Sequence, residues 1–275
     1  MGKILGSYLF PHPPIIIEDI GQGQEKKAGK TIEGVKSLAR SIRDKAPNTI
    51  IVITPHGPLF TDAISITIEE DLKGDFRKFG YWDIKLECKN DVNLAYRIIR
   101  NALSEGIQIA QVNMEFAKIN DVELDLDHGT IVPLYYVDKE YKDYKIVHII
   151  CGFLSPTELY DFGIGIKSAV EEVEGDAVIL ISGDLSHKLS DDDPYCFSPC
   201  GEEFDKKIIE ILKSGDMESL VAFDLELAER ADECGLRPLM IMAGALDKAK
   251  LNTEVLSHES PYGIGYCTAK LEVID

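Results

Sequence analysis

The sequence is poor in positive charge and in long apolar runs. It has 29 Lys and Arg residues against 48 Asp and Glu residues, a formal net charge of −19. Such an acidic chain repels phosphate backbones and anionic lipids, which argues against nucleic-acid and membrane partners. No apolar run approaches the roughly 20 residues that a membrane-spanning helix needs. The N-terminal residues also lack the apolar core of a signal peptide, so we expect a cytoplasmic protein.

Cysteines are few and scattered, and a chain of 275 residues can bury a core without disulfides. In a reducing compartment we expect all six to be free thiols: Cys88, Cys151, Cys196, Cys200, Cys234 and Cys267. Linkers rich in Gly and Ser, internal repeats and low-complexity segments are also missing. We therefore expect a single domain that spans residues 1–275.

Strand-like and helix-like patterns alternate along the chain. Apolar runs at 4–10, 49–54, 145–150 and 177–182 are typical of buried strands of a parallel sheet. The alternation over 63–68 predicts a strand with one solvated face. Helical stripes extend over 24–46 and 91–103, and Ser155-Pro156-Thr157-Glu158 forms a capping box that starts another helix. This order predicts an α/β fold on a mostly parallel, mixed sheet.

Three histidines follow the ends of apolar runs. His12, His56 and His187 each lie a few residues after a predicted strand. In open α/β sheets ligands bind outside the carboxyl ends of the strands, so these imidazoles are expected at one sheet edge. A proline or small residue lies beside each of them, and the prolines beside His12 and His56 stiffen the backbone. Several converging histidines predict a metal centre.

The other three histidines carry weaker signals. His128 is a fourth candidate for the site and is expected on a loop that leads to residues 131–134. His148 lies within a buried strand and is expected in the core. His258 is expected on a loop near the sheet edge, with structural and functional roles weighed equally.

A selective iron site also needs a carboxylate, as in the triad of two histidines and one carboxylate. Glu233 lies just before a helix predicted to begin at Leu236. A carboxylate at a helix start is also favoured by the helix dipole, so a purely structural role is open to it. Asp127, Asp184 and Glu259 are rivals by position, and composition does not choose among them.

Four motifs recur in order along most of the chain: Pro11-His12-Pro13-Pro14, Pro55-His56-Gly57, Asp127-His128-Gly129 followed by Val132-Pro133-Leu134, and Gly183-Asp184-Leu185-Ser186-His187. In order and spacing they resemble those of the LigB-type class III extradiol ring-cleavage dioxygenases and the related Memo-like proteins. The resemblance is strongest to the LigB-like domain of AmmeMemoRadiSam system protein A. It implies a LigB-like, three-layer α/β fold with a mononuclear iron site.

The resemblance also implies roles for individual residues. His12 and His56 match the family's two metal-binding histidines. The third ligand falls in the Glu233-Cys234 segment, where the dioxygenases have a glutamate and Memo-like proteins a cysteine. We expect Glu233, because a hard carboxylate suits Fe(II), with Cys234 as the alternative. His187 matches the family's acid–base histidine, and His128 its second active-site histidine.

The hypothesis that follows is an Fe(II)-dependent, extradiol-dioxygenase-like enzyme that cleaves a small aromatic diol with O2. Two alternatives stay open: a Memo-like metal-binding or redox protein, and a hydrolase or lyase that uses the same scaffold without oxygen. Zn or Cu is the alternative to Fe(II): the hydrolase or lyase would use zinc or iron, and the Memo-like protein could handle copper. The expected partners are a small aromatic substrate and O2, and formation of a homo-oligomer is left open.

Overall fold

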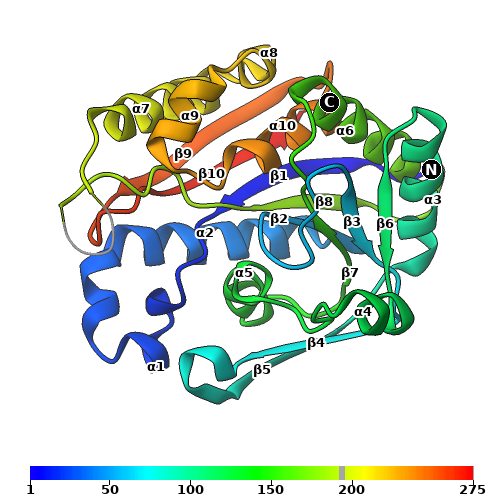
Figure 1. The fold of residues 1–275 in the computed structure, drawn as a ribbon, viewed down its shortest axis with the longest axis horizontal. Coiled ribbons are helices and arrows are strands. Elements are labelled where there is room, and N and C mark those ends of the chain that lie inside the picture. Colours follow the sequence, from blue (N-terminus) through cyan, green and yellow to red (C-terminus); the bar gives the residue numbers. More distant parts are fainter. Residues whose placement is uncertain (192–195, 275) are drawn as a thin grey trace.

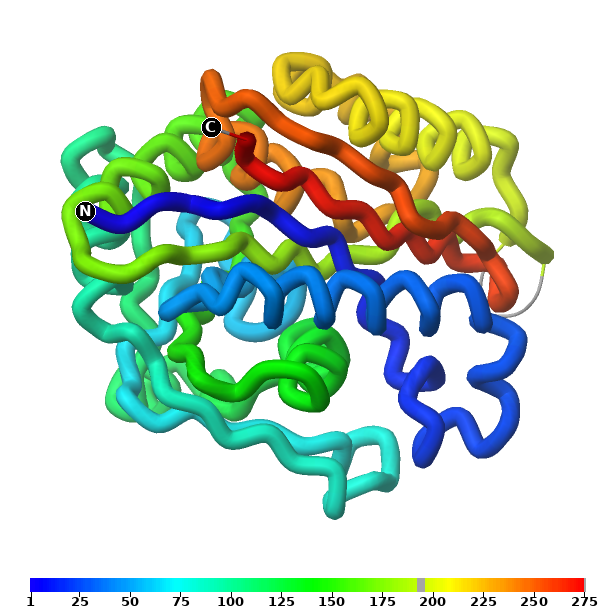
Figure 2. Tube along the Cα trace, turned by 180° about the vertical axis from the view of Figure 1, so that it is seen from behind, coloured from blue at the N-terminus to red at the C-terminus, as the bar shows by residue number. Residues whose placement is uncertain are grey.

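A mixed eight-stranded sheet organises the chain in the computed structural model, which describes residues 1–191 and 196–274. Its strand order is β6-β3-β7-β2-β8-β1-β10-β9 (Figure 1). Strands β7, β2, β8 and β1 are parallel neighbours, and β3 pairs antiparallel with β7. Strands β10 and β9 add an antiparallel edge beside β1 (Figure 2). The predicted α/β class with a mostly parallel, mixed sheet is confirmed.

The strands of this sheet are β1 (Ile4–Phe10), β2 (Thr49–Thr54), β3 (Ile64–Thr67), β6 (Ile109–Val112), β7 (Lys145–Ile150), β8 (Ala177–Ser182), β9 (Leu251–Glu259) and β10 (Tyr266–Val273). A separate hairpin is formed by β4 (Asp71–Phe76) and β5 (Tyr81–Lys89). The α-helices are α1 (Glu18–Gly21), α2 (Gly29–Lys45), α3 (Val92–Ser104), α4 (Met114–Asn120), α5 (His128–Asp138), α6 (Pro156–Glu171), α7 (Pro199–Ser214), α8 (Met217–Val221), α9 (Leu225–Ala231) and α10 (Leu236–Ala245). Short 3-10 turns cover η1 (Pro14–Ile16), η2 (Gln24–Ala28) and η3 (Arg77–Phe79).

Apolar side chains project from both faces of the central strands, so helices and the hairpin pack on both sides of the sheet. In β2, Ile51 and Ile53 join the core that includes α3, α6 and α10. Ile50 and Val52 join the opposite core, under α2, α5 and the β4–β5 hairpin (Figure 1). This produces the three layers that the resemblance implied.

Local signals placed several helix starts correctly. The Asp91 side chain accepts a hydrogen bond from the Leu94 amide and caps α3. The capping box predicted at Ser155 is formed with Glu158, and Pro156 opens α6. Each cap satisfies amide groups that have no partner inside the helix.

Three local expectations were wrong. His128 does not lie on a loop but is the first residue of α5, which is buried on nearly every side and therefore has no amphipathic stripe. All four residues of β3 are buried, so neither face of this strand is solvated, and Ile64 and Ile66 pack in the core with residues of α3. His258 lies within β9, opposite Cys267 of β10, and not on a loop.

None of the helices among the described residues is long and apolar enough to cross a membrane. The six cysteines are free thiols, as expected.

Candidate metal centre

Three neighbouring strands deliver the candidate site. Strand β8 lies between β2 and β1, and all three run parallel, so their carboxyl ends share one edge of the sheet. The chain leaving β1 carries His12, the chain leaving β2 carries His56, and the chain leaving β8 carries Asp184 and His187. The sequence argument from strand ends therefore located this edge.

Three imidazoles meet there. His12 Nε2 and His56 Nε2 are 3.1 Å apart. The His128 ring lies 4.5 Å from the His56 ring and 5.4 Å from the His12 ring, measured between centroids. Each histidine offers a nitrogen within 4.8 Å of the others. Among the described residues, these three form the group whose ligand atoms are close enough to share one metal ion.

Burial keeps these imidazoles neutral. Removal from water lowers the pKa of His12 well below its usual range, and lowers the pKa of His128 to about 4. Burial also lowers the pKa values of His56 and His187. A neutral imidazole has a lone pair on one ring nitrogen, and this is the form that binds metals.

The two residues considered for the third ligand have different surroundings. Cys234 Sγ lies 3.7 Å from His12 Nε2. Glu233 is directed to the start of α10, where its Oε2 accepts a hydrogen bond of 2.6 Å from the Leu236 amide. Burial raises the pKa of Glu233 to about 7. The structure therefore places the thiol, and not the Glu233 carboxyl, beside His12.

Asp184 is a buried carboxyl at the same edge. Its Oδ1 accepts a hydrogen bond of 3.0 Å from the His12 amide, and its Oδ2 lies 3.7 Å from His12 Nε2. Its own amide donates to Cys234 Sγ at 3.3 Å. Burial raises the pKa of Asp184 to about 7. Asp184 thus ties the His12 segment to the Cys234 segment.

Hydrogen bonds to Ala231 and Asp205 hold the segment that carries His187. The His187 amide donates to the Ala231 carbonyl, and the Ser186 amide donates to Asp205 Oδ1 at 2.9 Å. Asp205 Oδ2 in turn contacts His258 Nε2 at 2.6 Å. His187 follows β8, so it lies after the strand whose carboxyl end shares the sheet edge with β1 and β2.

A cavity of about 860 Å³ opens beside the imidazoles. His56, Asp127 and His128 line it, and so do residues of the turn at the tip of the β4–β5 hairpin. The Phe79 ring from that turn lies 5.4 Å from the His128 ring. Lys78, next to it, forms an ion pair with Glu123, which also lines the cavity. The cavity is large enough for a small aromatic molecule.

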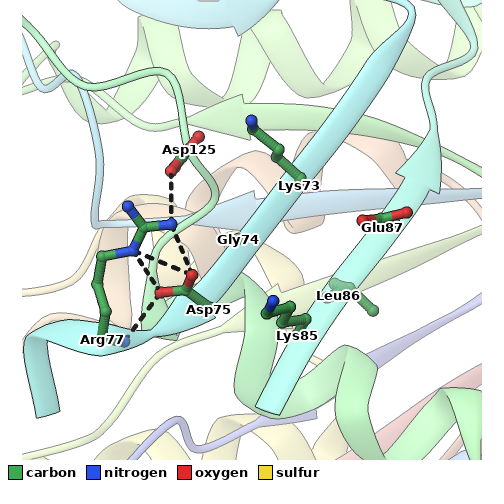
Figure 3. Close-up of a pocket in the computed structure, with 8 residues that line it drawn as sticks. All are labelled: Lys73, Gly74, Asp75, Arg77, Lys85, Leu86, Glu87 and Asp125. Carbon is green, nitrogen blue, oxygen red and sulfur yellow. Dashed lines mark hydrogen bonds and ion pairs between the residues drawn. The ribbon is translucent and has the colours of Figure 1, made fainter. Parts of the chain in front are cut away.

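The hairpin is tied to the segment that precedes His128. Gly74 of β4 pairs with Leu126, and a Cβ at this position would lie 2.4 Å from the Leu126 carbonyl oxygen. Around it, a smaller pocket of about 210 Å³ holds charged side chains of both signs. There the Arg77 guanidinium contacts Asp75 at 2.7 Å and Asp125 at 3.9 Å (Figure 3). These contacts connect the cavity wall to the site.

The donor set fits a transition-metal ion. Two nitrogens bound to one metal at about 2.1 Å lie roughly 3.0 Å apart in octahedral and roughly 3.4 Å apart in tetrahedral geometry. The His12–His56 separation of 3.1 Å falls between these values. A nitrogen and a thiolate bound at about 2.3 Å lie roughly 3.1–3.6 Å apart. The Cys234–His12 separation of 3.7 Å is close to that range.

One contributor was missed from the sequence. Ser182, the last residue of β8, is fully buried and lies 2.8 Å from His12 Nδ1. A polar residue at the end of an otherwise apolar strand was the available signal. His148 is in the core as expected, between the hydroxyls of Thr67 and Thr130.

Comparison with known proteins gives matches along nearly the whole chain. A family model described as the catalytic LigB subunit of aromatic ring-opening dioxygenase matches residues 6–269. Protein CA_C1420 of Clostridium acetobutylicum is 42% identical over 267 residues, which cover 97% of this chain and 57% of that protein. The chain therefore spans little more than half the length of this curated relative.

Two further similarities are more distant. The 3,4-dihydroxyphenylacetate 2,3-dioxygenase of Escherichia coli is 24% identical over 280 residues, covering 95% of this chain and 97% of that enzyme. The crystal structure of an uncharacterized protein of Escherichia coli K12, JW3007, superposes with a TM-score of 0.61 and 14% identity. It covers 97% of this chain and 99% of its own, and it supports the fold alone.

Proposed function

This chain belongs to the family of the catalytic LigB subunit of aromatic ring-opening dioxygenases, and on this premise we propose that it is an Fe(II)-dependent enzyme that cleaves a small aromatic diol with O2. The observation that carries the proposal is the convergence of His12, His56 and His128, two of which, His56 and His128, line a cavity sized for such a substrate. The distant relative named as a dihydroxyphenylacetate dioxygenase supports the reaction class.

In this proposal His12 and His56 hold the metal, and Cys234, which lies beside His12 but outside the group of three imidazoles, is the third ligand. The choice of Cys234 over Glu233 rests on the 3.7 Å separation of its sulfur from His12 Nε2 and on the Glu233 bond to the Leu236 amide. Binding would release the thiol proton, because burial raises the pKa of Cys234 and the thiolate is the ligand form. Bound Fe(II) would supply the redox chemistry that lets O2 react with a diol.

The remaining residues act on the substrate. His187 is neutral at pH 7 because burial lowers its pKa, so its imidazole can take a proton from a substrate hydroxyl. His128, which lines the cavity, would be a hydrogen-bonding partner of the substrate. The hairpin turn brings Phe79 beside His128, where its ring would pack against the substrate ring.

Metal content of anaerobically purified protein tests the proposal. We expect near-stoichiometric iron in the wild type, loss of that iron in His12→Ala, and retention of it in His187→Asn. With catechol as the probe, we expect oxygen uptake by the wild type and a decrease of about 100-fold or more in His187→Asn. Wild-type turnover by His187→Asn would contradict the acid–base assignment, and a protein that binds no metal after reconstitution would refute the metal centre.

The sulfur of Cys234 favours a second candidate function. A thiolate is a softer ligand than a carboxylate and suits Cu(I) or Zn as well as iron. A Memo-like metal-binding or redox protein is therefore the alternative. Stoichiometric copper or zinc that His12→Ala abolishes, without oxygen uptake on any catechol, would favour this alternative over the dioxygenase.

A further inference from the structure

Ser182 connects three elements behind the candidate metal centre. It ends β8, is fully buried, and pairs in register with Phe10 of β1, two residues before His12. Its hydroxyl contacts His12 Nδ1 at 2.8 Å and also the carbonyl oxygen of Gly129 in the first turn of α5. One hydroxyl group thus touches the loop after β1 and the helix that begins with His128.

These two contacts determine which ring nitrogen of His12 bears the proton. The Gly129 carbonyl can only accept, so the single hydroxyl hydrogen of Ser182 is directed to it. The Ser182 oxygen then accepts from His12, which places the imidazole hydrogen on Nδ1. In a neutral imidazole this leaves Nε2 with its lone pair, directed at His56 Nε2.

The Gly129 carbonyl is available because of a proline. In an α-helix the amide four residues later would donate to it, but that position is Pro133, which has no N–H. Glycine is also required at 129, since a Cβ there would lie 2.5 Å from Thr54 Oγ1 and 3.1 Å from the His56 ring. The hydrogen bond from Ser182 to Gly129 therefore depends on two motifs: Asp127-His128-Gly129 supplies the carbonyl, and Val132-Pro133-Leu134 supplies the proline that leaves it free.

We propose that Ser182 is a positioning residue for the metal centre: its hydroxyl, oriented by the Gly129 carbonyl that Pro133 leaves free, holds His12 in the Nδ1–H tautomer with Nε2 aimed at the metal. The inference rests on the proposed role of His12 as a ligand. A hydrogen bond to the far nitrogen of a ligating histidine fixes both the tautomer and the ring orientation.

Zinc affinity is the first measurement. Zn²⁺ is titrated into apo-protein against a chromophoric chelator, with His12→Ala defining binding elsewhere on this acidic surface. We expect Ser182→Ala to weaken zinc binding by about 10- to 100-fold. The matched control is Ser257→Ala, which removes a buried hydroxyl bonded to Thr268 on the distant β9–β10 pair and should retain wild-type affinity. Unchanged affinity in Ser182→Ala would overturn the proposal.

The second measurement identifies the tautomer of His12, and it requires neither bound metal nor catalytic turnover. In ¹⁵N-histidine-labelled apo-protein, long-range ¹H–¹⁵N spectra should show His12 with a protonated Nδ1. Ser182→Ala should move His12 toward the Nε2–H form and leave His148, bonded to two threonines, unchanged. An Nε2–H signal for His12 in the wild type would refute the positioning role. If the tautomer behaves as expected but the wild type binds no zinc or iron, the metal-centre proposal fails instead.

Discussion

At the scale of single residues, this site depends on burial that keeps imidazoles uncharged. His12, His56, His128 and His187 all have lowered pKa values, with desolvation as the largest cause for each. At pH 7 a metal ion would therefore not compete with protons for their lone pairs. The nearby acids Asp184 and Glu233 show the opposite effect of the same burial, because their charged form is the deprotonated one.

We predict different effects on the bound metal for variants of Cys234 and of its neighbour Glu233. In Co(II)-substituted protein we expect a thiolate-to-metal absorption band that Cys234→Ser abolishes, with a loss of metal affinity, because the sulfur lies beside His12. Glu233→Gln should keep the band, since Gln still offers an oxygen to the Leu236 amide. Absorption spectra and metal titrations of the two variants check this. A wild type without the band, together with a loss of metal affinity in Glu233→Gln and not in Cys234→Ser, would assign the ligand to Glu233.

At the scale of elements, His148 joins three parts of the fold. Its ring lies on β7 and bonds Thr67 at the end of β3 and Thr130 in α5. Complete burial lowers its pKa to about 4. The helix that begins with His128 is thereby held to the sheet by a side chain that stays uncharged when the protein is folded.

This pKa predicts a specific acid sensitivity. Between pH 6.5 and 4 the unfolded chain binds a proton on His148 that the folded protein does not, so stability falls as the pH falls. From pH 7 to 5 this group alone should decrease the free energy of unfolding by about 2 kcal/mol. Urea denaturation at both pH values measures this. The decrease in the free energy of unfolding from pH 7 to 5 should be smaller in His148→Gln than in the wild type, by that amount. Thr67→Val, which removes no titrating group, should keep the wild-type pH dependence.

The β4–β5 hairpin and α5 show how element contacts shape the site. The hairpin packs against the segment before His128 through Gly74 and Leu126, and its turn supplies Phe79 to the cavity wall. Helix α5 has no amphipathic stripe, because it is buried on nearly every side. In the hairpin, Ile84, Leu86 and Cys88 alternate with charged residues, a strand pattern for which the sequence analysis made no prediction. The positions of the hairpin and α5 follow from the apolar core they share with Ile50 and Val52 of β2.

At the scale of the whole molecule, the candidate ligands come from distant parts of the chain. His12, His56 and Cys234 are separated by up to 222 residues and meet only when the sheet is formed. A metal ion that uses them binds the folded state and not the unfolded chain. It should therefore stabilise the entire fold by linkage.

This linkage can be measured. At a free metal concentration 1,000 times the dissociation constant, Zn²⁺ should raise the free energy of unfolding by about 4 kcal/mol. Chelation with EDTA should remove the increase, and His12→Ala should show none of it. Urea denaturation with and without zinc checks the prediction. The variant is needed because a net charge of −19 attracts cations to the surface as well. An equal increase in His12→Ala would show that the stabilisation comes from that surface.

The sequence by itself determined β1, β2, β3, β7 and β8, several helix caps and the edge where His12, His56 and His187 emerge, because residue periodicity and capping act between near neighbours. Only the tertiary structure decided that α5 is a helix, that Cys234 and not Glu233 faces His12, and that Ser182 contacts Gly129 and His12. These contacts join residues far apart in the chain. They depend on sheet order and on the packing of helices over it, which no local pattern of residues specifies.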